Sequence, residues 1–281
     1  MRRALFPALL LVCQLTTAGL AAPAAGLPAA GAPAADTLLP MPPAPTATAE
    51  PAAVNEAARL LAAGRSLEAE QALQLAVKAH PQSAEAFYNL GLAQSFNGRH
   101  QEALASFRQA LALRADFPEA SLGLGTVLLT LGQPEPALAA FETALARTPD
   151  SPTGRAALFN KGTALGRLQR YTEAELALSE ALAADPDDPS PAFQIGKLKM
   201  QQQKWEDALG WLETTATAFP LETHLLSGKA YLKLRNRAAA ERSLIQAAAC
   251  LATAGLAADT QARLTREIDS LRQEAARLGD H

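Results

Sequence analysis

Apolar residues recur through most of the chain with the spacing of paired amphipathic helices. In the clearest stretch Phe87, Leu90 and Gly91 share one apolar face, and Leu104 and Phe107 begin another after a short polar interval. Spacings of three and four residues are those of an α-helix with one buried side. We therefore expect an all-α chain whose short helices pack in pairs.

The same pattern returns about every 34 residues, in six copies. One column is always alanine: Ala69, Ala103, Ala137, Ala174, Ala208 and Ala240. A second column, twelve residues earlier, holds small residues: Ala57, Gly91, Gly125, Gly162, Gly196 and Gly228. A large apolar residue follows the alanine by four: Leu73, Phe107, Phe141, Leu178, Leu212 and Leu244. Neither helix of a pair can bury its face alone, so the columns predict a stacked repeat array.

Small residues are expected where the two helices of a pair cross most closely, with Gly or Ala of the first helix opposite Ala of the second. A glycine inside a helix costs about 0.5 to 1 kcal/mol relative to alanine, so its recurrence implies a steric reason. Gly98 and Gly132 are expected in turns inside their copies. Four prolines are expected to end second helices: Pro81, Pro149, Pro186 and Pro220. An insertion, residues 152–154, should enlarge one loop between copies.

At these residues the sequence resembles the tetratricopeptide repeat family. The second copy carries the aromatic-leucine-glycine opening in Phe87, Leu90 and Gly91, and the middle of the motif in Ala103 and Phe107. The resemblance implies a right-handed α-α superhelical solenoid of about six units over residues 54–254. A C-terminal capping helix would complete it over residues 255–281.

The final helix is expected between Leu256 and Leu278. Its apolar face holds Leu264, Ile268, Leu271, Ala275 and Leu278, and charged residues cover the rest. This pattern favours a cap that closes the end of the array. The alternative, a self-association helix, requires a longer run of heptads.

Residues 1–21 have the pattern of a cleaved export signal. Arg2 and Arg3 precede an apolar run that ends at Cys13, and small residues lead to a cleavage site after Ala21. An uncleaved anchor and a lipidated Cys13 are the alternatives. We expect an exported protein, periplasmic or secreted, with no membrane span in the mature chain.

Residues 22–53 form an Ala/Pro-rich linker, in which 8 of 32 residues are Pro and 13 are Ala. Such a segment is expected to be extended and disordered, either as a plain spacer or as a docking site for a polyproline reader. After signal cleavage Cys250 would be the only thiol, so no disulfide within the chain is expected.

Composition and residue spacing argue against several classes of function. A net charge of −3 leaves no large cationic surface for nucleic acid. His80, His100, His224 and His281 have no cysteine or carboxylate at metal-ligand spacing. No phosphate loop or nucleophile elbow is present either. We expect a non-enzymatic protein with no metal and no cofactor.

The family resemblance implies that first helices line a concave groove that binds a partner protein or peptide. Carried over by position, the groove residues are Tyr88, Asn89, Leu92, Phe96, Thr126, Phe159, Asn160, Thr163, Arg167, Phe193, Gln194, Lys197, Leu225, Lys229 and Lys233. Asn55, Asn89 and Asn160 share one column, and side-chain amides there could pair with the N–H and C=O of an extended peptide. The alternative is an ordinary hydrated surface.

The aromatic and basic members of this set suggest two kinds of contact. Tyr88, Phe159 and Phe193 are either apolar anchors for a ligand or packing residues between helices, and we expect packing for at least one. Lys197, Lys229 and Lys233 are expected on one solvated face, suited to an acidic partner.

Two functions from different classes follow. The first is an exported interaction module that binds a partner segment in its groove. The second is a structural scaffold component of a bacterial envelope secretion, pilus or polysaccharide-export assembly, contacted on its convex side.

Overall fold

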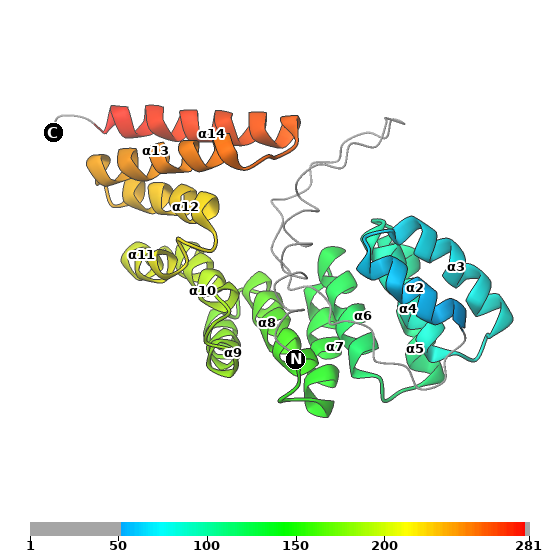
Figure 1. Ribbon diagram of the computed structural model, residues 1–281. Coiled ribbons are helices and arrows are strands. Elements are labelled where there is room, and N and C mark those ends of the chain that lie inside the picture. The colour runs from blue at the N-terminus through cyan, green and yellow to red at the C-terminus, as the bar shows by residue number, and fades with distance from the viewer. Residues whose placement is uncertain (1–51, 279–281) are drawn as a thin grey trace. The chain divides into compact units, whose positions relative to one another are not determined.

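The computed structural model describes residues 52–278, and within this range it contains thirteen α-helices (Figure 1). The expected signal, residues 1–21, and nearly all of the expected linker lie outside the described residues. The last two linker residues, Ala52 and Ala53, already belong to the first described helix. The all-α prediction is confirmed.

The helices fall into two compact units, which we call the N-terminal unit (52–185) and the C-terminal unit (186–278). The N-terminal unit contains α2 (Ala52–Ala62), α3 (Ser66–Ala79), α4 (Ala84–Phe96), α5 (His100–Leu113), α6 (Pro118–Thr130), α7 (Pro134–Arg147), α8 (Pro152–Arg167) and α9 (Tyr171–Ala184). Each helix packs on the next in sequence, and the first helices α2, α4, α6 and α8 also contact one another in that order.

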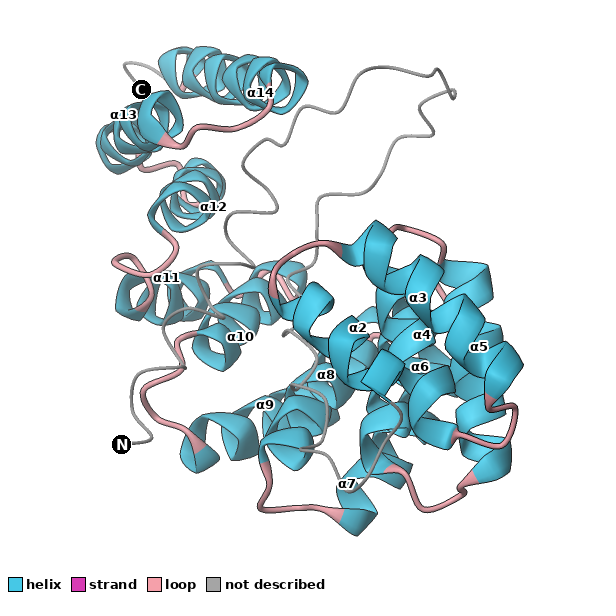
Figure 2. Ribbon diagram, turned by 45° about the vertical axis from the view of Figure 1, so that its right-hand side comes forward, coloured by secondary structure: helices cyan, strands magenta, loops and turns pink. Residues whose placement is uncertain are grey.

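The C-terminal unit contains α10 (Ser190–Gln201), α11 (Trp205–Thr214), α12 (Pro220–Lys233), α13 (Arg237–Thr253) and α14 (Ala258–Arg277). Consecutive helices again pack on one another, and α14 contacts both α12 and α13 (Figure 2). Ile268 and Ala275 of α14 are buried, with Leu264 and Leu271 partly buried beside them. The cap interpretation predicts this arrangement.

Turns inside the pairs have one residue in the left-handed region. Gly98 and Gly132 have φ of +73°, as expected from their place in the sequence. In the later pairs the equivalent residues are Gln169, Gln203 and Arg235, with φ between 55° and 60°. Side chains disfavour this conformation, so the turn geometry is imposed by the packing of the two helices.

Three of the four prolines lie where the sequence predicts them, and the prediction for Pro220 is wrong. Pro81, Pro149 and Pro186 follow the ends of second helices, as predicted. Pro220 instead begins α12, six residues after Thr214, the last residue of α11. Proline suits the first position of a helix because the amide hydrogen it lacks has no partner there.

In each pair whose first helix carries a glycine in the second column, that glycine lies directly against the large apolar residue sixteen positions later. A Cβ added to Gly91 would lie 2.9 Å from the Phe107 ring, and one at Gly125 would lie 2.5 Å from Phe141 Cε1. Leucine takes the same place in the later pairs, as at Gly228 and Leu244. The expected partner was the alanine column. The alanines are buried, but the ring or leucine is what requires glycine.

Phe107 also links one pair to the next. A Cβ on Gly123 of α6 would lie 2.7 Å from the Phe107 ring, which therefore touches glycines of both α4 and α6. The ring belongs to the main apolar cluster of the N-terminal unit, together with Phe117 and Phe141. Packing within this helix pair and packing against the next pair thus depend on the same side chain.

The insertion does not enlarge a loop. Residues 152–154 form the first turn of α8, which has 16 residues where most first helices have 11 to 14. Ser151 caps this turn, because its Oγ accepts a hydrogen bond from the Gly154 amide at 3.0 Å. A Cβ on Gly154 would overlap the main-chain oxygens of Thr148 and Pro149. Glycine lets the preceding loop cross directly over the helix start.

Replacing Gly154 with Ala should lower the free energy of unfolding by about 1 to 3 kcal/mol, because main-chain atoms must move to admit the methyl group. Gly210 is the matched control, since it lies inside α11 with nothing within 4 Å of an added Cβ. Alanine there should raise stability by up to about 1 kcal/mol. Urea titration followed by circular dichroism measures both. Equal effects would contradict the helical placement of residues 152–154.

Candidate partner-binding face

The predicted groove residues all lie on first helices. We call the side of α4, α6 and α8 on which the predicted residues of the N-terminal unit lie the first-helix face; Phe96 and Arg167 are its exposed members, and the other predicted residues on it are buried. It carries nine of the predicted residues: Tyr88, Asn89, Leu92 and Phe96 on α4, Thr126 on α6, and Phe159, Asn160, Thr163 and Arg167 on α8. The other six lie in the C-terminal unit: Phe193, Gln194 and Lys197 on α10, and Leu225, Lys229 and Lys233 on α12.

Three of the four predicted aromatic residues are buried. Tyr88 and Phe159 have no exposed surface, and Phe193 is almost fully buried. The ring centroid of Tyr88 lies 4.9 Å from that of Phe117 and 6.0 Å from that of Phe107. At least one of the three was expected to pack between helices, and Tyr88 of α4 does so against Phe107 of α5. Burial of all three rings leaves none of them open to a ligand in this structure.

Phe96 is the exception among the aromatic residues. It is the last residue of α4, and its side chain is 62% exposed. Leu92, one turn earlier on the same helix, is buried. Phe96 therefore presents a large apolar surface to solvent on the first-helix face.

Polar contacts fix the start of α4, and sequence reasoning missed them. Arg114 forms an ion pair with Glu85, and its guanidinium carbon lies 3.6 Å from the centroid of the Phe117 ring. Burial raises the pKa of the Tyr88 phenol well above its usual value, and the charge of Glu119 adds to the effect. The phenol hydroxyl has no hydrogen-bond partner. No local spacing relates Arg114 to Glu85, so periodicity could not have found this network.

The amide column is buried and only partly paired. Asn89 Nδ2 donates to the Glu85 carbonyl at 2.9 Å, and Asn160 Nδ2 lies 3.5 Å from Thr126 Oγ1. The Oδ1 atoms of both asparagines have no hydrogen-bond partner, and neither has Nε2 of Gln194. A buried acceptor without a donor is costly, so these oxygens are sites where a donor would be favourable. The Nδ2 donors of Asn89 and Asn160, by contrast, already have contacts within the chain.

The predicted threonines of the first-helix face, Thr126 and Thr163, donate their hydroxyl hydrogen bonds to carbonyls of their own helices. Thr126 Oγ1 donates to the Leu122 carbonyl at 2.9 Å, and Thr163 Oγ1 donates to the Phe159 carbonyl at 3.1 Å. Arg167 lies at the end of α8 with an exposed side chain, and its Nη1 donates to the Leu129 carbonyl of α6. That bond holds the guanidinium across two first helices.

The three lysines of the C-terminal unit do not share one solvated face. Lys229 Nζ lies 2.6 Å from Glu267 Oε1 of α14, and only about a third of either side chain is exposed. Lys197 is half-buried, whereas Lys233 is exposed. The prediction failed for Lys229 because the final helix supplies its counter-charge. Leu225 beside it is buried in the apolar cluster that α14 covers.

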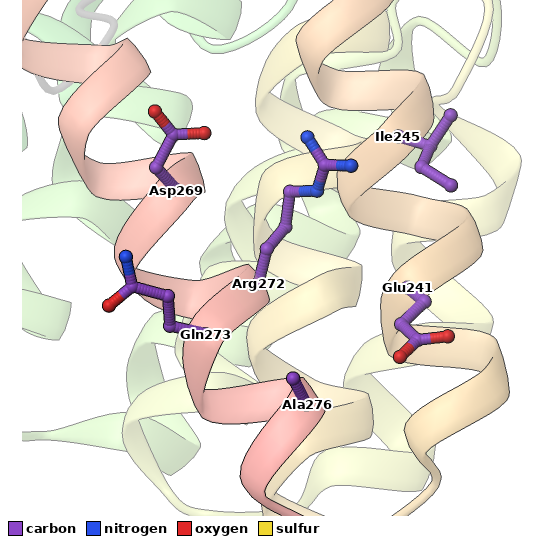
Figure 3. Close-up of a pocket in the computed structure, with 6 residues that line it drawn as sticks. All are labelled: Glu241, Ile245, Asp269, Arg272, Gln273 and Ala276. Carbon is purple, nitrogen blue, oxygen red and sulfur yellow. The ribbon is translucent and has the colours of Figure 1, made fainter.

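A shallow pocket lies between α13 and α14, away from the predicted residues (Figure 3). Its lining comprises Glu241, Ile245, Asp269, Arg272, Gln273 and Ala276. Arg272 points from α14 toward α13, and Glu241 is paired with Arg237 at 2.8 Å. The mixture of both charges with one exposed isoleucine gives no arrangement suited to catalysis.

Residues 52–278 contain neither a group of side chains suited to a metal ion nor a helix suited to span a membrane. In this part of the chain no three His, Cys, Asp or Glu side chains are grouped so that they could hold a metal ion. Over the same residues, no helix combines the length and apolar character needed to cross a bilayer.

Solved structures similar to this chain include PilW, PilF and MamA. The PilW structure, described as a widely conserved type IV pilus biogenesis factor, is 25% identical, with a TM-score of 0.66 over 75% of this chain and 96% of PilW. PilF of Pseudomonas aeruginosa is 19% identical, with a TM-score of 0.60 over 69% of this chain and 88% of PilF. MamA of Desulfovibrio magneticus RS-1, from residue 41 onward, is 24% identical, with a TM-score of 0.53 over 58% and 90%. Because PilF and MamA are less than 25% identical to this chain, their similarity shows the fold alone.

No curated protein matches the chain in sequence. The model of the tetratricopeptide repeat family matches residues 54–116, 88–152 and 122–189, which confirms the resemblance for the first four copies. Together with the helix pairs described above, these matches show that the chain carries a tetratricopeptide repeat array, a non-enzymatic scaffold for protein-protein interaction.

Proposed function

We propose that the protein is an exported adaptor that binds a segment of a partner protein across the first-helix face. The observation that carries this proposal is the exposure of Phe96. A side chain that is 62% exposed contributes little to packing, whereas aromatic anchors dominate the binding energy of many interfaces. Among the aromatic residues expected to bind a ligand, Phe96 alone is available in this structure.

The equivalent positions on the neighbouring first helices are also exposed. Thr130, 34 residues after Phe96, ends α6, and Arg167, a further 37 residues along, ends α8. Helices that pack side by side are about 8 to 10 Å apart, so the three positions span about 20 Å. An extended segment of about six residues covers that distance. Its apolar side chain would contact Phe96 and an acidic group would suit Arg167.

The unpaired amide oxygens support the same binding mode. Asn89 and Asn160 lie on α4 and α8, the helices that also carry Phe96 and Arg167. Their Oδ1 atoms lack donors, and the main-chain N–H groups of an extended segment are donors. Because both amides are buried, this contact requires local side-chain movement, and Phe96 would be the first point of attachment.

The second candidate is a structural component of a pilus-type envelope assembly, contacted on its second helices. The similarity to the PilW structure, over most of both chains, favours this function. The two candidates differ in which helices the partner touches.

Site-specific photocrosslinking in intact cells separates the two functions. A photoreactive residue at position 96 or 130 should capture the partner if the first-helix face binds it. Gln109 is the matched position on the outer side of α5, where it is equally exposed. Asn160 is unsuitable because its side chain is buried. Capture from position 109 with none from 96 or 130 would refute the adaptor function and favour the scaffold.

Export is part of the proposal and rests on the sequence of residues 1–21. The mature chain should begin near Ala22, because small residues precede that bond and the apolar run is too short to span a membrane. The intact mass of the protein isolated from cells measures this directly. A mass that includes residues 1–21 would contradict cleavage, and an added lipid mass would favour lipidation at Cys13.

A further inference from the structure

The outer face of α3 carries two exposed leucines. Leu67 and Leu75 are 67% and 68% exposed, the highest values among the large apolar side chains of residues 54–278. With Gln71 between them they form a stripe at i, i+4 and i+8, which is one side of a helix. We call these three residues the α3 stripe.

The repeat itself does not require these leucines. The residues equivalent to Leu67 in the next four second helices are Gln101, Glu135, Thr172 and Glu206, and those equivalent to Leu75 are Gln109, Thr143, Glu180 and Thr214. Helix pairs therefore fold with polar residues at both positions. Leucine at both positions on α3 alone indicates a contact that the other second helices do not make.

The opposite side of α3 is firmly attached to its own chain. Ala69 and Leu73 are buried against the first pair and α4. The buried Glu70 accepts hydrogen bonds from Asn97 Nδ2 at 2.6 Å and Arg99 Nη1 at 2.5 Å. α3 contacts α2 and α4, and its remaining side lies at the edge of the N-terminal unit (Figures 1 and 2). The stripe is thus a fixed surface.

We propose that the α3 stripe is a self-association surface, which binds α3 of a second copy of this chain in antiparallel orientation. The stripe is symmetric about Gln71, so a two-fold axis there places Leu67 of each copy beside Leu75 of the other. The two Gln71 amides then meet at the centre and can bond to each other. A self-complementary patch is what a two-fold interface requires.

Charges at the ends of α3 favour this orientation over the parallel one. Lys78 lies near the C-terminal end of α3 and Glu68 near its N-terminal end. Antiparallel pairing brings Lys78 of one copy within about one helical turn of Glu68 of the other, which is also ion-paired with Arg65 at 2.5 Å. Parallel pairing would place the two Lys78 side chains together and align the helix dipoles.

The interface is small, because one helix per copy covers less than the roughly 800 Å² per partner of a standard interface. We expect a weak dimer that dissociates in the micromolar range. Sedimentation velocity of the full chain across that range should show a concentration-dependent dimer. Changing Leu67 and Leu75 together to Glu should raise the dissociation constant by about tenfold or more, since each copy loses two apolar contacts. Leu176→Glu, at an equally exposed leucine of α9, is the control and should leave dimerisation unchanged.

Disulfide trapping tests the register and does not depend on the stability of the Glu variants. With Cys13 and Cys250 changed to Ser, Gln71→Cys should form a crosslinked dimer on oxidation, because the two-fold axis passes beside it. Ala105→Cys occupies the equivalent position on α5 and should remain monomeric. A chain that stays monomeric throughout the range, a dimer unaffected by the Leu67 and Leu75 changes, or equal crosslinking from positions 71 and 105 would overturn the proposal.

Discussion

The contact between a glycine on a first helix and the large apolar residue sixteen positions later is the constraint on which the structure depends. Phe107 shows why, since its ring touches glycines of both α4 and α6. A side chain at either glycine would push its helix away from the ring and separate neighbouring pairs. The repeated cost of glycine inside helices is accepted because it permits this close approach. Leucine serves the same purpose in the later pairs, with less surface to bury.

This packing decides which residues remain for binding. Tyr88 and Phe159 are fully buried, so among the predicted aromatic residues the surface that a partner could use is reduced to Phe96 at the end of α4. Arg167 remains exposed at the end of α8, anchored to a carbonyl of α6. In the C-terminal unit, α14 neutralises Lys229 through Glu267. The helix ends therefore carry the chemistry available to a ligand, while the helix middles hold the array together.

Periodicity predicted the helix pairs because burial of one face acts within a few turns of the chain. It failed where the outcome depends on contacts that the repeat columns do not contain. The insertion at residues 152–154 lengthened a helix because Ser151, three residues before Gly154, caps it and Gly154 lets a carbonyl pass close by. The pairing of Lys229 with Glu267 joins residues 38 positions apart, and the exposure of Phe96 beside buried Leu92 depends on where the next helix lies. The 34-residue pattern encodes none of these contacts. The candidate site was thus located on the right helices, but which of its side chains are exposed required the structure.

Hydrogen exchange on a Phe107→Leu variant tests most directly whether this ring holds successive first helices together. The smaller side chain leaves a gap against both Gly91 and Gly123, so amide protection should fall in α4, α5 and α6. Because repeat arrays are stabilised by neighbouring contacts, protection in α12, α13 and α14 should stay unchanged. A uniform loss along the chain, or undiminished protection in α6, would contradict the account.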